Sequence, residues 1–236
     1  MDYRAGEVIA MYKPRRWTSF GVVSRVRNRL TEALGEKIKV GHAGTLDPLA
    51  TGVVLLCTGK ATRRIEELQS GVKEYVADLK IGATTPSYDC EHDEDATYPT
   101  DHITRARLEA VLRSFVGEQD QVPPVFSACK VNGSHAYHLA RRGREPELRA
   151  KRVTIYEIEL LAYCLPEVQI RVLCSKGTYI RALARDIGKR LESGAYLTTL
   201  RRTRVGDYTL ADCRTMEQMA EELCTSGADC GLGIKN

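Results

Sequence analysis

The chain has 236 residues, of which 43% are hydrophobic and 28% are charged, and its formal net charge is +4. This composition is ordinary for a folded globular protein and excludes wholesale disorder. No segment approaches the ~20 consecutive apolar residues of a membrane span, and the first residues lack the apolar region of a signal peptide. We therefore expect a cytoplasmic protein with no membrane partner.

The positions of the cysteines and of the charged residues further limit the class of protein to which this chain can belong. Eight cysteines lie at wide spacings without paired C-x-x-C motifs, so we expect reduced thiols and no structural zinc. Residues 1–64 hold twelve Lys/Arg against five acids, 130–152 seven against two, and 171–204 nine against two, whereas 78–101 hold seven acids against one Lys. Such blocks suit a polyanionic partner on one side, although solvated faces that cluster in sequence would give the same counts.

The first part of the chain alternates short strands and helices. A strand is predicted over residues 7–12, and Thr18 or Ser19 can cap the helix that follows. Another strand is predicted over 53–57, and a helix over 61–68. The apolar residues of the first helix are spaced four apart (Val22, Val26, Leu30, Leu34), and those of the next strand alternate (Tyr75, Ala77, Leu79, Ile81).

The second part begins with an acidic stretch, residues 86–101, that has no apolar period and is predicted to be a solvated loop. A helix around 108–115 precedes a basic excursion over 121–152, which carries a short predicted helix at 135–142. Two strands, 153–165 and 167–175, form a predicted hairpin at Pro166. The remaining elements are a helix with apolar residues Ile180, Leu183, Ile187 and Leu191, a strand at 204–210 and a helix at 215–224.

Hairpins mixed with helices predict an α+β fold rather than a doubly wound sheet. The sequence has no internal repeat and no long linker, so we expect one continuous domain over 1–236 with the insertion at about 121–152.

The glycine-rich stretch 39–63 contains a single carboxylate, Asp47, together with His42. A P-loop does not fit, because Gly59 and Lys60 lack the upstream glycine at the required spacing. A metal site does not fit, because His42 and Asp47 supply only two ligands. Asp47 precedes a proline, so its carboxylate could simply hydrogen-bond its own turn; otherwise the loop presents one acid beside closely approaching backbone.

Residues 41–52, GHAGTLDPLATG, resemble the signature of the TruB family of tRNA pseudouridine synthases. Further matches follow the order of that family: Lys13-Pro14 with Thr18-Ser19, Lys73-Glu74-Tyr75, Ser127-Ala128 with Lys130 and Gly133, Ser175 to Arg181, and Leu200-Arg201-Arg202. The resemblance covers about residues 7 to 210 and implies the pseudouridine synthase fold, a mixed and mainly antiparallel sheet flanked by helices.

Two features depart from the family pattern. The loop pattern Thr-x-Thr-x-Asp-x-x-Gly is replaced by residues 84–89 and a following acidic run, which leaves the role of this loop open. Many relatives also carry a C-terminal PUA domain that grips the tRNA acceptor end. We expect this domain to be absent here and the catalytic domain to bind RNA by itself.

The resemblance implies isomerisation of uridine 55 in the tRNA T loop to pseudouridine, with Asp47 as the catalytic residue and no cofactor or metal. Asp47 may add to the base, attack the anomeric carbon or remove the C2′ proton, and the sequence does not choose among these. Arg181 is expected beside Asp47. Tyr75 is expected to stack on the flipped uracil, and Tyr179 and Leu200 to line the pocket, although each could be ordinary core packing.

The resemblance also implies RNA contacts. His42 is a candidate wedge into the T loop, which has to release its target base. The cations expected to bind the tRNA T stem-loop are Lys13, Lys130, Arg141, Arg142, Arg144 and Lys176, and the excursion 121–152 is expected to clasp RNA. The excursion arginines could instead merely solubilise a loop. We expect a monomer.

Two other functions fit the same residues. A pseudouridine synthase of different site choice would modify RNA outside the T loop. A non-catalytic RNA-binding or tRNA-folding protein would tolerate Asp47→Asn, since binding depends on phosphate contacts and stacking rather than on that acid.

Overall fold

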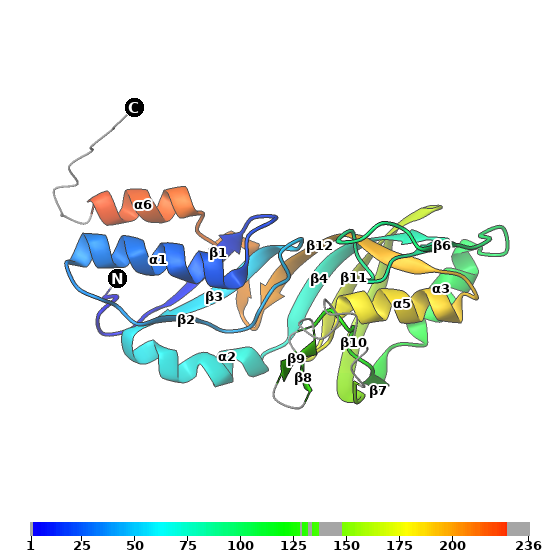
Figure 1. Ribbon diagram of the computed structural model, residues 1–236, viewed down its shortest axis with the longest axis horizontal. Helices are drawn as coiled ribbons and strands as arrows, with labels where there is room; N and C mark the ends of the chain where they lie inside the picture. The colour runs from blue at the N-terminus through cyan, green and yellow to red at the C-terminus, as the bar shows by residue number, and fades with distance from the viewer. Residues whose placement is uncertain (1, 128, 132–133, 137–147, 226–236) are drawn as a thin grey trace. The chain divides into compact units, whose positions relative to one another are not determined.

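A computed structural model describes residues 2–127, 129–131, 134–136 and 148–225 of the chain. The chain divides into two compact units (Figure 1). Unit 1 consists of Met1–Gly71 and Arg202–Asn236, and unit 2 of Val72–Arg201.

Unit 1 is built on strand β3 (Thr51–Thr58), which pairs antiparallel with β1 (Val8–Lys13) and with β2 (Val40–His42). The apolar run of β3 is buried on both faces, as its continuous hydrophobic sequence predicts. The end of β12 (Ala195–Val205) belongs to this unit and pairs with β13 (Tyr208–Thr209).

The helices of unit 1 cover both faces of these strands. In Figure 1, α1 (Ser19–Leu34) and α6 (Met216–Thr225) lie on one side, and α2 (Ile65–Ser70) lies on the other, preceded by the 3-10 helix η1 (Gly59–Arg64). The Thr18 side chain caps α1 by accepting a hydrogen bond of 2.9 Å from the Gly21 N–H, and the predicted apolar face is buried at Val22, Val26 and Leu30. The predicted cap and face of this helix are thus confirmed.

The strands of unit 2 follow the order β12-β4-β11-β10-β7, and the pairs β4–β11, β11–β10 and β10–β7 are antiparallel. β4 (Lys73–Ile81) buries every second residue, as predicted, and β10 (Lys151–Cys164) and β11 (Glu167–Cys174) form the predicted hairpin. The other elements are β7 (Gly117–Gln121), α3 (Arg105–Arg113), α5 (Ile180–Arg190), and two short hairpins, β5 (Ala83–Thr84) with β6 (Ala96–Thr97) and β8 (Lys130–Val131) with β9 (Ser134–His135). The expected α+β class, with a mainly antiparallel sheet flanked by helices, is confirmed.

Several local predictions are corrected. The stretch 86–101 is not merely a solvated loop, because Ser87 and Asp89 within it are buried and Ala96–Thr97 form a strand. The single strand expected at 204–210 is instead a tight hairpin, in which the end of β12 at Arg204 and Val205 pairs with β13 across a turn at residues 206–207. The helix expected at 61–68 begins as a 3-10 helix before it becomes α2. Most of the helix expected at 135–142 lies outside the described residues.

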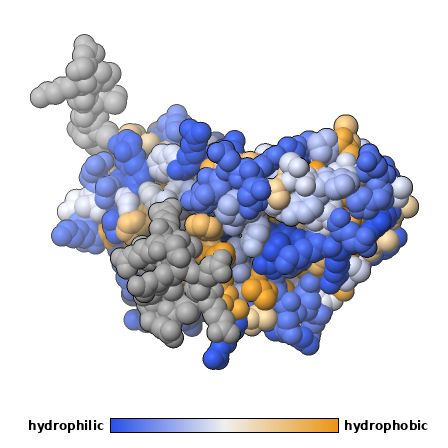
Figure 2. Space-filling view, turned by 45° about the vertical axis from the view of Figure 1, so that its right-hand side comes forward, coloured by the Kyte–Doolittle hydropathy of each residue, from blue (hydrophilic) through white to orange (hydrophobic). Residues whose placement is uncertain are grey.

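The surface shown in Figure 2 is mainly hydrophilic, with hydrophobic residues in small patches. None of the helices in the described parts of the chain is both long enough and apolar enough to cross a bilayer.

Helix α5 packs closely at Gly188, which generates a stability prediction. A Cβ atom added there would lie 2.4 Å from the Ala195 nitrogen and 2.7 Å from the Gly194 carbonyl carbon. Gly188→Ala should therefore lower the unfolding free energy by about 1–3 kcal/mol, even though alanine is the better helix former. Urea unfolding measures this, with the exposed neighbour Lys189→Ala as the control. Equal stability of Gly188→Ala and wild type would contradict the packing described.

Candidate active site

Asp47 lies in the loop that joins β2 to β3, and glycines shape this loop. Gly44 and Gly52 adopt positive φ angles of 105° and 109°, which L side chains rarely accept. At Gly52 a Cβ atom would also lie 2.1 Å from the Arg202 carbonyl oxygen. Gly44 therefore permits the turn of the loop, and Gly52, at the start of β3, allows the chain to pass directly against the backbone of β12.

Hydrogen bonds fix the backbone on both sides of Asp47. The Ser19 hydroxyl accepts from the Leu46 N–H at 2.8 Å and donates to the Leu46 carbonyl at 3.1 Å. The Pro48 carbonyl accepts from the Arg16 N–H at 2.7 Å, and the Ala50 N–H donates to the Asp47 carbonyl at 3.1 Å. The half-buried Asp47 side chain thus projects from a backbone with little freedom.

Two buried cations anchor the same loop. Arg202 is 2% exposed and donates from Nε to the Val53 carbonyl at 2.8 Å, and from Nη1 and Nη2 to the carbonyls of Thr45 and Gly44 at 3.2 and 3.4 Å. Lys13 is fully buried, and its Nζ donates to the carbonyls of Trp17 at 2.8 Å, Pro14 at 3.0 Å and Pro48 at 3.2 Å. Carbonyl oxygens thus replace the water that both cations lose.

Lys13 is electrostatically coupled to Asp47. Burial lowers the pKa of the Lys13 ammonium to about 8, the charge of Asp47 acts to raise it, and the charge of Arg202 acts to lower it. A side chain with no exposed surface cannot reach phosphate, which does not fit the expectation that Lys13 binds substrate directly. Lys13 instead holds the backbone and the electrostatic surroundings of Asp47.

His42 ends β2, and its half-buried side chain belongs to the same unit. Burial lowers the pKa of its imidazole, the backbone of Gly44 acts in the opposite direction, and the charge of Arg202 lowers it further. Its Nδ1 atom has no hydrogen-bond partner among the described residues. The imidazole therefore has a buried ring nitrogen without a hydrogen-bond partner among the described residues.

In unit 2, Arg181 opens helix α5 and is 5% exposed. Its Nε atom lies 3.6 Å from Asp89 Oδ2, and its Nη1 donates to the Ser87 carbonyl at 3.4 Å. The other carboxylate oxygen of Asp89 accepts from the Ser87 hydroxyl at 2.6 Å and from the Glu91 N–H at 3.0 Å. The loop whose role the sequence leaves open therefore supplies a buried carboxylate that holds Arg181.

Tyr179, just before α5, is held at both ends. Gln121 accepts from the Tyr179 N–H at 2.8 Å and donates to its carbonyl at 3.2 Å. The Tyr179 hydroxyl lies 3.3 Å from Cys129 Sγ, to which Lys151 also donates at 3.4 Å. Burial raises the pKa of the Cys129 thiol, but its hydrogen bonds and the charge of Lys151 outweigh burial, so the pKa is lowered overall.

The other expected site residues fall as follows. Tyr75 in β4 is 8% exposed and lies opposite Val172 of β11, whereas Leu200 in β12 is half-buried. Lys176 is exposed in the turn before α5. Lys130 is in β8, and Arg141, Arg142 and Arg144 lie outside the described residues. Asp47, His42 and Lys13 thus belong to unit 1, and Arg181, Tyr75, Tyr179, Leu200 and Lys176 to unit 2.

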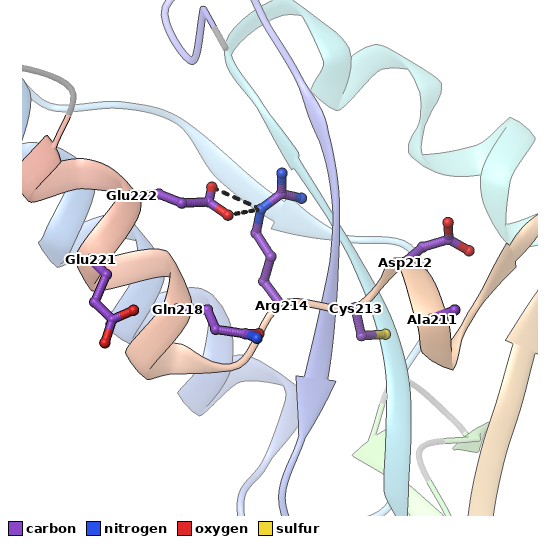
Figure 3. A pocket seen from close by; sticks show the side chains of 7 residues that line it. All are labelled: Ala211, Asp212, Cys213, Arg214, Gln218, Glu221 and Glu222. Carbon is purple, nitrogen blue, oxygen red and sulfur yellow. Dashed lines mark hydrogen bonds and ion pairs between the residues drawn. The ribbon is translucent and has the colours of Figure 1, made fainter.

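Unit 1 also contains a pocket that is lined by other residues than those expected at the site. Its lining includes Arg214, which points toward Glu222 of α6 and forms an ion pair of 2.8 Å with it (Figure 3). None of the expected site residues lines this pocket. Among the described residues, no group of three or more His, Cys, Asp or Glu is placed to hold a metal ion.

Comparison with known proteins identifies the family. The model of the TruB family pseudouridylate synthase N-terminal domain matches residues 31–180, and that of the tRNA pseudouridylate synthase B C-terminal domain matches residues 181–229. The tRNA pseudouridine synthase B of Phocaeicola vulgatus is 61% identical, covering 94% of this chain and 95% of its own length. That of Flavobacterium johnsoniae is 47% identical, covering 94% and 98%. The chain therefore belongs to the TruB family of pseudouridylate synthases.

Solved structures agree in fold. A chain in the crystal structure of a Cbf5-Nop10-Gar1 complex matches with a TM-score of 0.70 and 30% identity, covering 94% of this chain and 55% of its own length. A chain in the structure of an H/ACA RNP bound to a substrate RNA containing 2′-deoxyuridine matches with a TM-score of 0.67 and 27% identity, over 94% and 54%. The expected fold and enzyme class, a pseudouridine synthase and hence an isomerase, are confirmed.

Three residues that shape the site were not assigned a role from the sequence. Asp89 is hidden in an acidic run, where a carboxylate is normally solvated. Gln121 ends a strand with no apolar pattern. Arg202 belongs to a quoted motif, yet its charge alone indicates surface. The only sequence signal for Asp89 was its place after Thr84-Thr85 in the loop that departs from the family pattern.

The coupling between Lys13 and Asp47 gives a titration prediction. In wild type the Lys13 side chain should titrate near pH 8, and in Asp47→Asn at a lower pH, because the carboxylate charge that raises the Lys13 pKa is gone. Nuclear magnetic resonance of the lysine side chains measures both midpoints. The exposed acid Asp207→Asn is the matched control and should leave Lys13 unchanged.

The same shift fixes the sign of a stability effect. Lys13 in the unfolded chain titrates near its ordinary value of 10.5 and therefore binds its proton more tightly than in the folded chain. The contribution of Lys13 to the unfolding free energy accordingly rises with pH between about 8 and 10.5. A Lys13 midpoint that does not move in Asp47→Asn would remove the proposed coupling.

Proposed function

We propose that this chain isomerises uridine 55 in the T loop of tRNA to pseudouridine, with Asp47 as the catalytic residue. The observation that carries the proposal is a single carboxylate on a glycine-shaped loop whose backbone is fixed by Ser19 and by two buried cations, Lys13 and Arg202. Relatives with 61% identity over almost the whole chain are tRNA pseudouridine synthases, which supports tRNA as the substrate.

The reaction exchanges one glycosidic bond for another. The C1′–N1 bond breaks, the uracil turns within the site, C5 bonds to C1′, and the proton that C5 loses is balanced by one that N1 gains. Nothing is oxidised and no group leaves, so the net reaction requires no cofactor or metal. Three roles are open to the Asp47 carboxylate: it adds to the base, attacks the anomeric carbon or removes the C2′ proton.

Unit 2 supplies the remaining parts of the proposed site. Arg181 provides the cation that accompanies Asp47, and Asp89 holds its guanidinium in a fixed place. Tyr75 stacks on the uracil, while Tyr179 and Leu200 line the pocket. The two hydrogen bonds from Gln121 to the Tyr179 backbone support a fixed position for that ring. We propose that 1–236 acts as one catalytic domain.

RNA binding must release the target base from the folded T loop, at a cost of a few kcal/mol in lost stacking. His42 is proposed as the wedge that fills the gap, and its lowered pKa favours a neutral ring suited to stacking at pH 7. The exposed Lys176 and the cations of the insertion at 121–152, namely Lys130, Arg141, Arg142 and Arg144, are proposed to contact phosphates. The protein is proposed to act as a monomer in the cytoplasm.

Asp47→Asn and Asp47→Ala should abolish pseudouridine formation and leave tRNA affinity within about tenfold of wild type, because phosphate contacts and stacking do not involve the acid. The assay treats unmodified tRNA with each protein and maps pseudouridine by sequencing, with tritium release for rate. Asp207→Asn is the matched control from the same unit and should retain full activity.

The outcomes separate the rival functions. Pseudouridine formed by purified Asp47→Ala would refute the catalytic role. Modification mainly outside the T loop would overturn the assignment to uridine 55. A wild-type protein that binds tRNA but forms no pseudouridine would be a non-catalytic RNA-binding protein.

The clasp is tested separately. Arg142→Ala combined with Arg144→Ala should weaken tRNA binding and reduce the dependence of log affinity on log salt by about two phosphate contacts. Arg105→Ala combined with Arg113→Ala, on the exposed side of α3, is the charge-matched control. Equal affinity and slope in the insertion variant and this control would argue against the clasp.

A further inference from the structure

Two aromatic side chains are exposed at the start of α1. Trp17 precedes the N-cap of the helix and is 37% exposed, and Phe20 in its first turn is 64% exposed. Single exposed hydrophobic residues are ordinary on soluble proteins. Here two aromatic residues lie within four positions at the start of a helix, where the fold needs no apolar side chain. Such a pair is suited to bind a partner that has flat apolar surfaces.

The surrounding charge indicates what kind of partner this is. Residues 8–31 contain six Lys/Arg and no Asp or Glu. Arg15 and Arg16, which directly precede Trp17, are exposed and form no ion pair with a described residue. Arg27 shares the helix face of Phe20, since the two are seven positions apart. Aromatic rings interleaved with unpaired guanidinium groups match the bases and phosphates of single-stranded RNA.

Hydrogen bonds fix the aromatic segment to the loop that carries Asp47. The Pro48 carbonyl accepts from both the Arg16 N–H at 2.7 Å and Lys13 Nζ at 3.2 Å, and the Trp17 carbonyl accepts from Lys13 Nζ at 2.8 Å. Arg16 adopts a left-handed φ of 69° to make this turn, a conformation that costs a non-glycine residue free energy. The carbonyls of Trp17 and of Pro48, the residue after Asp47, thus accept hydrogen bonds from the same Lys13 ammonium.

We propose that Trp17 and Phe20 form a stacking platform for unpaired bases of the substrate RNA close to the nucleotide on which Asp47 acts, with Arg15 and Arg16 on the adjoining phosphates. This inference rests on the proposed function and adds a binding surface outside the residues assigned above. Stacking uses the face of any base, so the platform contributes affinity and position rather than a choice of sequence.

The test compares side chains that differ only in having an aromatic face. Phe20→Leu and Trp17→Leu keep apolar surface but lose the ring, and each should weaken tRNA binding about tenfold. The RNA concentration for half-maximal rate should rise more than the maximal rate falls, and the salt slope should stay as in wild type. Phe20→Tyr should restore affinity to within about twofold. Tyr156→Leu in β10, at a residue that is 46% exposed, is the matched control.

Arg16→Gly provides an independent measurement. Glycine accepts the left-handed backbone, so this variant should unfold no more easily than wild type while it reduces the salt slope of tRNA binding by about one phosphate contact. Thermal unfolding of every variant accompanies the binding assay. The unfolding data show that each measured affinity belongs to a folded protein.

Several results would overturn the platform. Affinity within twofold of wild type in both leucine variants would do so, as would equal losses in Phe20→Leu and Phe20→Tyr. Vesicles of anionic phospholipid test the alternative partner, and vesicle binding that depends on Phe20 while tRNA affinity does not would assign the surface to a membrane. Pseudouridine formation by wild type is scored in the same samples, so failure of the platform is distinguishable from failure of the proposed function.

Discussion

Two cations cut off from water, Lys13 and Arg202, hold the loop that carries Asp47. Burying a charge is costly unless hydrogen bonds replace its hydration, and here six backbone carbonyl bonds do so. Because the acceptors are main-chain atoms, the two cations define the path of the loop rather than the conformation of a few side chains. The path of the loop in turn determines the position of Asp47.

The same cations also determine the charge around Asp47. A loop held by carbonyls leaves the positive charge of Lys13 available to Asp47, and the opposing effects on the Lys13 pKa are the evidence that the two groups interact. The backbone position of Asp47 and the positive charge near it thus have one physical source.

In unit 2, Arg181 is held in place by a carboxylate side chain as well as by a backbone carbonyl. Asp89 receives hydrogen bonds from Ser87 and from the Glu91 N–H, which leaves its second oxygen to face Arg181. An arginine with 5% exposure is thereby restricted to one orientation. The positive φ of Tyr88, 61°, shows that the chain accepts a locally unfavourable backbone to bring Ser87 and Asp89 inward together.

Sequence reasoning predicted the elements whose burial follows a simple period. Strand β4 and helix α1 show their burial in the alternation of β4 and in the four-residue spacing of Val22, Val26 and Leu30. It missed β7, because an edge strand reading Gly-Glu-Gln-Asp-Gln has no apolar face to display.

The residues of the candidate site were also predicted only in part. The family motif proposes Asp47 and Arg181 as site residues, but sequence reasoning treats charge as exposure. It therefore assigned Lys13 to the RNA surface and left Asp89 in a solvated loop, although both side chains are buried. Which charged residues lie inside depends on carbonyls and partners brought together from distant parts of the chain, and no local window contains that information.

Gln121 has a mechanical consequence. It is the last residue of β7, where the chain leaves the sheet for the insertion, and its amide grips both polar backbone groups of Tyr179. A displacement of the chain at Val122 would be passed directly to the first turn of α5, the turn that carries Arg181, through a single side chain. Two hydrogen bonds therefore link the position of the chain at the start of the insertion to the orientation of that arginine.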